Sequence, residues 1–221
     1  METPACTVRV EAGQPLADAL AAGGVVCLGP GVHVGPLMLT HSVTLRGEPG
    51  AVLDGRGGGA VVSVADDDVV VRIESLTLRG GAGDSGGGVS LTAYSEITLV
   101  DCVIANNRSK SPGGGGGGGG AYASRGSLRL QGVTLYDNRA AIGSDLLVTG
   151  VAEATVSGGH LGGDIAAREG AVLALERVVV DGALDARGTS TRAPTVKVVG
   201  PTPAGGVHND PTLPARIELS P

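Results

Sequence analysis

The sequence predicts an all-β fold in which about seven strand-bearing coils stack into one elongated body, closed at its start by an α-helix. Three observations support this fold class: a quasi-repeat of short alternating strands, a composition dominated by small residues, and a single amphipathic segment near the N-terminus. Forty of the 221 residues are glycine, and Trp and Phe do not occur. Without large rings, the core must consist of thin layers of Val, Leu, Ile and Ala, which suits a narrow stack of coils.

The repeat is clearest over residues 126–138, where two alternating strands flank a Gln-Gly corner. Alternation with period 2 buries one face of each strand. The same pattern begins at five positions separated by 26, 31, 26 and 19 residues, namely Val71, Ile97, Leu128, Ala154 and Leu173. Repeats of this length indicate stacked arrays, and a 3.6-residue period is confined to the region near residues 16–22. The repeating unit is therefore made of strands.

A turn residue is expected ten positions after each start, at Gly81, Asn107, Asn138, Asp164 and Ala183. Four of these five are Gly, Asn or Asp, the residues that adopt a left-handed backbone at least cost. We therefore predict a left-handed turn at this position, with a ladder of side-chain amides between Asn107 and Asn138.

Residues 13–22 form the predicted helix, with Leu16, Ala19 and Leu20 on one face and Gly23-Gly24 ending it. A stack of coils leaves its first apolar layer open to water, and an amphipathic helix can close it. We therefore predict an N-terminal cap over residues 1–24. The segment that begins at Met1 has neither a basic n-region nor an apolar h-region, so no secretory signal is expected within this chain.

Three cysteines bear on the compartment. Cys6 and Cys27 flank the predicted helix, which could bring them together, while Cys102 lies at a corner of the repeat and is expected to be buried. A Cys6–Cys27 disulfide and three unreactive thiols both fit this pattern. The sequence is correspondingly compatible with a cytoplasmic protein and with the mature segment of an extracytoplasmic one.

Two motifs follow the predicted helix. A strand and turn of the form V-x-L-x-P-G-x-[YH] ends at His33, and a V-T-L-x-G strand begins at Val43. With the helix before them, they resemble the opening of right-handed parallel β-helix proteins of the pectate-lyase-like superfamily. The motif positions are Val26, Leu28, Pro30, Gly31 and His33, then Val43, Thr44, Leu45 and Gly47. The resemblance implies a single-stranded right-handed parallel β-helix, here over residues 25–200.

The central coils are similar to the paired G-G-A-I and F-x-x-N repeats of polymorphic outer-membrane adhesins. The glycine pairs lie in 86–89 and 118–121, and the second motif lies in 104–107 and 135–138. Ile104 and Leu135 stand where those repeats have Phe. Both resemblances indicate a fold and leave activity open, because this architecture carries lyases, hydrolases, epimerases, adhesins and inert scaffolds.

Two segments depart from the repeat. The run Gly113–Gly120 has no side chains to bury and a high backbone entropy, so we predict a loop on the outside of the stack. Six of the twelve prolines occur at Pro194 and beyond, and proline cannot donate in an interior ladder. We therefore predict that the strand repeat ends near residue 200 and that residues 201–221 form an extended Pro-rich tail over the last coil.

The candidate chemistry centres on the acidic run at residues 66–68. Asp66 and Asp68 would point to one face, and consecutive carboxylates are natural Ca²⁺ ligands. Arg72 and Arg79 follow and could neutralise a uronate or act as a base. The competing interpretation is a solvated acidic turn between two strands. These four residues are the candidate catalytic set, Asp66 and Asp68 are the candidate Ca²⁺ ligands, and no motif indicates another cofactor.

Two further features are candidate functional elements. His160 and Asp164 form a second candidate acid–base pair, against the alternative of a surface or coil-packed histidine. The only aromatic residues are Tyr94, Tyr122 and Tyr136, all in the central coils. Such rings can line a sugar-binding face or serve as packing and turn residues.

Two functional hypotheses follow. The first is a non-catalytic extracytoplasmic β-helix module for adhesion, assembly or surface structure on a bacterial cell, with a surface protein or a glycan as partner. The alternative is a small polysaccharide lyase, hydrolase or epimerase acting on an acidic glycan. The net charge of −6 argues against nucleic acid, and no run reaches the roughly 18 apolar residues of a membrane span. The sequence leaves the oligomeric state open.

Overall fold

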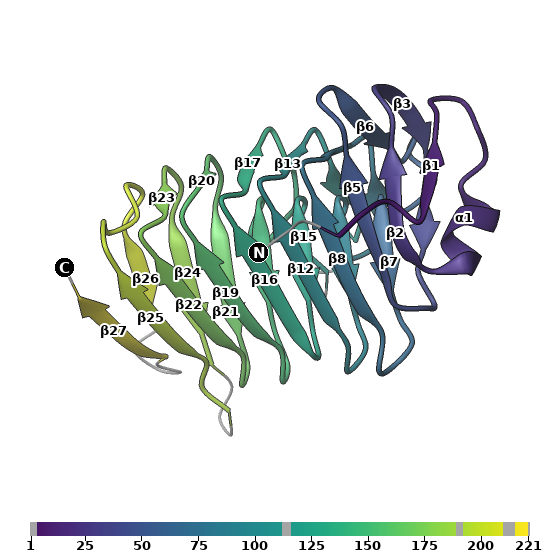
Figure 1. Cartoon of the computed structure of the whole chain (residues 1–221). Coiled ribbons are helices and arrows are strands. Elements are labelled where there is room, and N and C mark those ends of the chain that lie inside the picture. Colours follow the sequence, from purple (N-terminus) through teal and green to yellow (C-terminus); the bar gives the residue numbers. More distant parts are fainter. Residues whose placement is uncertain (1–3, 112–115, 189–191, 210–214, 221) are drawn as a thin grey trace.

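The computed structural model describes residues 4–111, 116–188, 192–209 and 215–220. Its strands form three long parallel sheets and one short two-stranded pair. The chain passes from the ten-stranded sheet to the seven-stranded sheet, then to the eight-stranded sheet, and returns to the ten-stranded sheet one strand further on. Figure 1 shows these coils winding in the right-handed sense from α1 (Ala17–Ala22) towards the C-terminus. The molecule is the predicted right-handed parallel β-helix.

The ten-stranded sheet contains, in order, β1 (Val8–Val10), β2 (Gly24–Leu28), β5 (Val43–Gly47), β8 (Val70–Glu74), β12 (Glu96–Val100), β16 (Ser127–Gln131), β19 (Glu153–Ser157), β22 (Val172–Glu176), β25 (Thr195–Val199) and β27 (Arg216–Ser220). The seven-stranded sheet contains β3 (Gly31–Val34), β6 (Ala51–Asp54), β9 (Thr77–Arg79), β13 (Val103–Ala105), β17 (Thr134–Tyr136), β20 (His160–Leu161) and β23 (Val179–Val180).

The eight-stranded sheet contains β4 (Leu37–Met38), β7 (Val62–Val64), β11 (Val89–Leu91), β15 (Ala121–Ala123), β18 (Leu146–Val148), β21 (Ile165–Arg168), β24 (Leu184–Arg187) and β26 (Val207–Asn209). The short pair is β10 (Ala82–Gly83) with β14 (Arg108–Ser109). Seven coils place a strand in all three long sheets, as the size of the seven-stranded sheet shows. This agrees with the coil number predicted from the repeat.

The strand register follows the predicted repeat. Val71 pairs with Ile97, Ile97 with Leu128, Leu128 with Ala154, and Ala154 with Leu173. All five side chains are buried and belong to one continuous apolar core inside the three sheets. A one-residue slip would turn this column to the outside, so the alternating pattern fixes the register.

The left-handed turn lies one residue earlier than predicted. Gly80, Asn106 and Asp137 have φ angles of 69°, 56° and 53°. The next residues, including Asn107 and Asn138, turn their side chains into the buried interior instead. A second left-handed position recurs where the chain leaves the ten-stranded sheet, at Ser75, Asp101, Gly132, Gly158 and Arg177. The prediction of a left-handed residue at the tenth position is therefore wrong by one residue in these three coils, and in the coils of Asp164 and Ala183 neither that residue nor the one before it has a positive φ angle.

The predicted amide ladder is present and ends on a carboxylate. Asn107 accepts a hydrogen bond from the Gly81 N–H at 2.9 Å and donates through Nδ2 to Asn138 Oδ1 at 3.2 Å. Asn138 Nδ2 donates to Asp145 Oδ1 at 2.8 Å, and Asp145 Oδ2 accepts from the Gly163 N–H at 2.7 Å. Burial raises the pKa of the Asp145 carboxyl, and the hydrogen bond from Asn138 partly offsets this effect.

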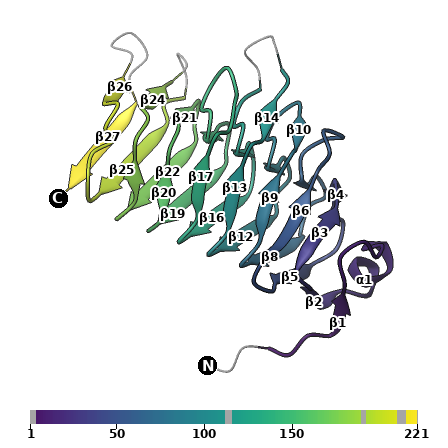
Figure 2. The same cartoon turned by 90° about the horizontal axis from the view of Figure 1, so that it is seen from above.

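The N-terminal helix is shorter than predicted but caps the first coil as expected. The helix α1 begins at Ala17 rather than residue 13, because Gly13 has a φ angle of 84° and the chain turns before Pro15. It ends at Gly23, whose φ angle is 68°. Leu16 and Ala19 are buried, and Leu20 packs against the core. Figure 2 shows α1 at one end of the stack and β27 at the other.

The polyglycine prediction is wrong for its described part. Residues 113–115 lie outside the described residues, but Gly116–Gly120 is buried rather than an outer loop. The Gly88 N–H donates to the Gly120 carbonyl at 3.0 Å, which joins this segment to the preceding coil. A Cβ on Gly88 would overlap both the Gly120 carbonyl and the Ile104 side chain. Glycine is needed here because two backbones approach closely.

Strand pairing also continues past residue 200, contrary to the prediction. The strand β26 extends the eight-stranded sheet, and β27 extends the ten-stranded sheet beside β25. Residues 210–214 and 221, which include three of the prolines, lie outside the described residues. Pairing continues because the described strands in this segment contain no proline. Apart from this pairing beyond residue 200, the predicted boundaries of the cap (1–24), the β-helix (25–200) and the tail (201–221) stay predictions.

Two of the three cysteines form a disulfide, and the third is a free thiol. Cys6 and Cys27 form a disulfide with a Cα–Cα distance of 5.7 Å. This bond fixes the N-terminal segment to β2 on the outer side of the ten-stranded sheet, where Arg46 also donates to the Pro4 carbonyl at 2.7 Å. Cys102 is a buried free thiol, as predicted. Burial raises the pKa of the Cys102 thiol to about 11.

Candidate functional site

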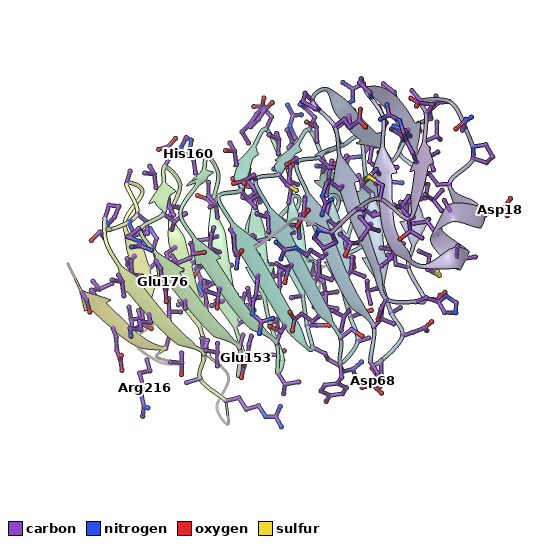
Figure 3. The ribbon with its side chains drawn as sticks, in the orientation of Figure 1. Asp18, Asp68, Glu153, His160, Glu176 and Arg216 are labelled. Carbon is purple, nitrogen blue, oxygen red and sulfur yellow. A yellow bond between two sulfur atoms is a disulfide. The ribbon has the colours of Figure 1, made fainter. Side chains whose placement is uncertain are left out.

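The residues of the predicted catalytic set lie on different parts of the β-helix. Asp66 and Asp68 belong to the loop between β7 and β8, whereas Arg72 lies on the ten-stranded sheet and Arg79 on the seven-stranded sheet. In Figure 3 Asp68 lies at one long edge of the molecule and His160 at the opposite edge. The structure therefore does not gather the four residues into one site.

Both arginines of that set form ion pairs with other carboxylates. Arg72 contacts Glu74 at 2.6 Å, and Arg46 contacts the same carboxylate at 2.7 Å. Burial raises the pKa of Glu74, but the hydrogen bonds from Arg46 and Arg72 outweigh burial and lower it overall. Arg79 contacts Asp54 at 3.1 Å. These guanidinium groups are already neutralised by residues outside the predicted set.

The acidic run instead supports the next coil. Asp67 Oδ1 accepts a hydrogen bond from the Tyr94 N–H at 2.8 Å. The Asp68 N–H donates to the Tyr94 carbonyl at 3.1 Å, and the Ser95 hydroxyl donates to the Asp66 carbonyl at 2.7 Å. The loop at 65–69 thus fixes the backbone of the loop that carries Tyr94.

These loops belong to a series that joins the eight-stranded sheet to the ten-stranded sheet in successive coils. We call the loops at 65–69, 92–95, 124–126, 149–152 and 169–171 the corner row. The Val151 N–H donates to the Ser124 carbonyl at 3.2 Å, and Arg125 donates to the Thr92 carbonyl at 3.2 Å. Side chains at equivalent loop positions therefore follow one another along the axis of the β-helix.

A polar groove with a volume of about 450 Å³ opens along the corner row. It is lined by Thr92, Tyr94, Tyr122, Ser124, Arg125, Thr149, Gly150, Val151, Glu169 and Arg192. Tyr94 is 59% exposed, and the Arg125 guanidinium lies 5.9 Å from the centre of its ring. Tyr122 is only 8% exposed because it packs on Leu147 outside the eight-stranded sheet. We call this cavity the tyrosine groove.

The tyrosine groove places an aromatic ring beside hydrogen-bonding groups. An exposed ring offers a flat apolar face, while hydroxyl and guanidinium groups beside it donate hydrogen bonds to a polar ligand. Tyr136, the third tyrosine, is 43% exposed on β17 and lies in a different sheet. The three tyrosines therefore have different surroundings: Tyr94 is an exposed ring of the groove, Tyr122 packs on Leu147, and Tyr136 is exposed on another sheet.

A second groove of about 330 Å³ lies further along the eight-stranded sheet. Its ionisable lining residues are Asp164, Arg168, Asp185, Arg187 and His208. Asp185 accepts from Arg168 at 2.5 Å through Oδ2 and from Arg187 at 2.8 Å through Oδ1. Both carboxylate oxygens of Asp185 are thus occupied by guanidinium groups. Arg168 borders this groove, and its chain neighbour Glu169 borders the tyrosine groove.

The predicted His160–Asp164 pair does not form. His160 Nε2 lies 2.7 Å from Asp181 Oδ2 in the next coil, while Asp164 Oδ1 accepts from the Ala183 N–H at 2.8 Å. Among the residues that the structure describes, no group of three or more His, Cys, Asp or Glu side chains is arranged to hold a metal ion. Within the described residues, Asp66 and Asp68 are thus not joined by a third His, Cys, Asp or Glu ligand.

Sequence reasoning missed the corner row although the repeat contained the signal. Counting three residues back from the strand starts 71, 97, 128 and 154 gives Asp68, Tyr94, Arg125 and Val151. The predicted turn positions all follow the strand starts, whereas the residues of the corner row precede them. The second groove left no such signal, since its residues come from loops and strands at different repeat positions.

Comparisons with known proteins leave the family open. No protein-family model matches the chain, and no curated protein or solved structure is significantly similar to it. Within the described residues, no helix has the length and apolar character needed to cross a bilayer.

Proposed function

We propose that this chain is a non-catalytic extracytoplasmic β-helix module that binds a glycan for adhesion or surface assembly. The observation that carries the proposal is the tyrosine groove. It combines an exposed ring, a guanidinium group beside that ring and three Ser or Thr hydroxyls in one open cavity. Sugar rings stack on aromatic faces and present hydroxyls to polar neighbours, so this combination suits a saccharide.

The Cys6–Cys27 disulfide supports the extracytoplasmic part of the proposal. Disulfides persist in oxidising environments and are rare in the reducing cytosol. We further propose a relationship to the pectate-lyase-like superfamily, supported by the V-x-L-x-P-G-x-[YH] and V-T-L-x-G motifs, which lie on β2, β3 and β5. A bacterial, adhesin-like surface role rests on the repeat resemblance alone.

The glycan proposal is tested by titration calorimetry of the protein with tetragalacturonate as an acidic probe and cellotetraose as a neutral one. We expect saturable binding of at least one probe and a loss of about fivefold or more in affinity for Tyr94→Ala, because ring stacking contributes roughly 1 kcal/mol or more. Tyr136→Ala is the matched control, since it removes an exposed tyrosine from a different sheet. Equal affinities for both variants, or no binding of either probe, would remove the proposal's support.

One observation favours the alternative, a lyase, hydrolase or epimerase acting on an acidic glycan. The second groove brings Asp164, Asp185 and His208 together with two arginines, which is the mixture of groups that acid–base chemistry uses. A turnover assay and the same titration with Ca²⁺ separate the hypotheses further. Turnover of an acidic oligosaccharide that is lost in His208→Ala would favour an enzyme at the second groove, and saturable Ca²⁺ binding lost in an Asp66→Ala, Asp68→Ala double variant would favour a separate Ca²⁺ site; binding of sugar without turnover or Ca²⁺ favours the module.

A further inference from the structure

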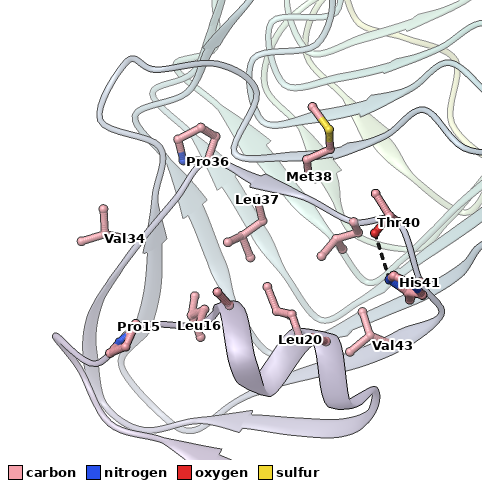
Figure 4. Close-up of a pocket in the computed structure, with 13 residues that line it drawn as sticks. Pro15, Leu16, Leu20, Val34, Pro36, Leu37, Met38, Thr40, His41 and Val43 are labelled. Atoms are coloured by element: carbon pink, nitrogen blue, oxygen red, sulfur yellow. Dashed lines mark hydrogen bonds between the residues drawn. The ribbon is translucent and has the colours of Figure 1, made fainter.

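The cap region contains a cavity that the proposed function does not use. It lies between α1 and the segment that leads from β3 through β4, and its volume is about 540 Å³ (Figure 4). Leu16, the residue before the helix, and Leu20 on the helix line one wall, and Leu37 faces them from the other (Figure 4). Volumes of this size are typical of sites for small ligands. We call this cavity the cap pocket.

The lining of the cap pocket is almost free of polar side chains. Of its thirteen lining residues, only Thr40 and His41 carry a polar side chain. None of them is Asp, Glu, Lys or Arg, although the chain as a whole is 17% charged. A saccharide or a charged peptide would leave its polar groups unpaired against these walls.

The walls remain apolar where they meet water. Leu16 and Leu37 form a buried floor at 5% and 7% exposure, whereas Met38 is 72% exposed and Val34 is 45% exposed at the rim. Val32 on the same strand as Val34 is 37% exposed. Exposed apolar side chains at the rim of a concave surface are typical of a binding site.

Polar groups gather at one end of the cap pocket. Thr40 Oγ1 and His41 Nδ1 lie 2.9 Å apart, and Figure 4 shows them beyond Leu20, away from Pro15 and Val34. Both side chains are exposed, so they can reorient towards a ligand. The pocket therefore has an apolar body and a single polar end, which matches an amphiphile with one aliphatic chain and one polar head group.

We propose that the cap pocket binds a free fatty acid of medium chain length. The aliphatic chain lies between Leu16 and Leu20 on one side and Leu37 on the other. The carboxylate lies at the Thr40–His41 end, where a hydroxyl and an imidazole can donate hydrogen bonds to it. This occupant satisfies both the uncharged lining and its one polar end, and the site is independent of the tyrosine groove.

The test is titration calorimetry of the full chain with octanoate, decanoate and dodecanoate, each below its micelle-forming concentration. We expect one saturable site whose affinity rises between about twofold and about fourfold for each added methylene, as apolar burial requires. Ala17→Glu and Ala21→Glu should each weaken dodecanoate binding at least tenfold, because both exposed helix residues line the pocket. The matched control Ala22→Glu places the same charge on an exposed helix position outside the lining and should bind like the wild type.

The head-group assignment has its own readout. A Thr40→Val, His41→Ala double variant should lose the preference for dodecanoate over dodecanol while it retains dodecanol binding. Affinities that do not depend on chain length, or an equal loss in Ala22→Glu, would overturn the proposal. Loss of a dimer in sedimentation on Met38→Glu would also overturn the proposal, because the pocket would then be a contact between copies. Loss of binding to phosphatidylcholine vesicles in the same variant would overturn it too, if the protein does not bind free dodecanoate.

Discussion

Replacing Asn138 with alanine should destabilise the β-helix strongly, because this side chain links two coils through buried hydrogen bonds. Its Oδ1 accepts from the Asn107 N–H at 3.1 Å and from Asn107 Nδ2 at 3.2 Å, and its Nδ2 donates to Asp145 Oδ1 at 2.8 Å. Alanine leaves the Asn107 N–H and the Asp145 carboxylate without these partners. At about 1–3 kcal/mol for each buried group, the expected loss is roughly 2–6 kcal/mol.

The assay is urea unfolding at pH 7 followed by far-ultraviolet circular dichroism. Gln131→Ala removes an exposed amide from the same coil and should change the free energy of unfolding by less than about 0.5 kcal/mol. Burial already raises the pKa of Asp145, and the variant loses the Asn138 hydrogen bond that opposes this shift. The folded carboxyl then binds a proton more readily than the unfolded one. The deficit of Asn138→Ala should therefore shrink as the pH falls from 7 towards the usual Asp value of 3.8.

A loss below about 1 kcal/mol for Asn138→Ala, or a deficit that grows on acidification, would refute the reasoning. The first outcome would mean that water or neighbouring backbone replaces the lost partners. The second would mean that the Asp145 carboxylate is better accommodated in the fold than in the unfolded chain.

Three further outcomes are expected. The Cys6→Ser, Cys27→Ser double variant should lose about 3 kcal/mol of stability in denaturant titrations, because the disulfide spans 21 residues of sequence; a loss that persists when both proteins are measured in reductant would contradict this. Cys102 should resist iodoacetamide at pH 8 in the native protein and react after unfolding, since its pKa is raised to about 11; rapid native labelling seen by mass spectrometry would show that the coil opens. Glu74→Gln should destabilise the protein at pH 7 and progressively less below the usual Glu value of 4.5, because the lowered pKa of Glu74 contributes stability that is lost on acidification; a difference independent of pH would contradict the two arginine ion pairs.

The fold was predictable because it depends on periodic burial. The column of apolar residues from Val71 to Leu173 fixes the register of five consecutive coils, and alternation makes that column visible in the sequence. Turn geometry was harder to predict. Asn106 and Asn107 are chemically identical neighbours, and only the packing of successive coils decides which one takes the left-handed backbone and which one is buried.

The candidate sites were less accessible to sequence reasoning. Asp66 and Asp68 were predicted as a site because they belong to a run of carboxylates, but their loop contacts the Tyr94 loop, which follows one full coil later in the sequence. The polyglycine segment was assigned to the exterior on entropy alone, whereas Gly120 is buried where two backbones meet. Contacts between coils decide such cases, and composition does not report them.

The central claim is that the tyrosine groove binds a glycan without altering it. The most direct measurement is a proton NMR time course of the tetrasaccharide that binds, recorded over a day with the protein at a tenth of the ligand concentration. We expect saturation transfer from the protein to the sugar protons, lost in Tyr94→Ala and retained in Tyr136→Ala, with an unchanged anomeric region throughout. New anomeric, unsaturated or epimer signals that depend on the protein would contradict the claim and establish the enzyme.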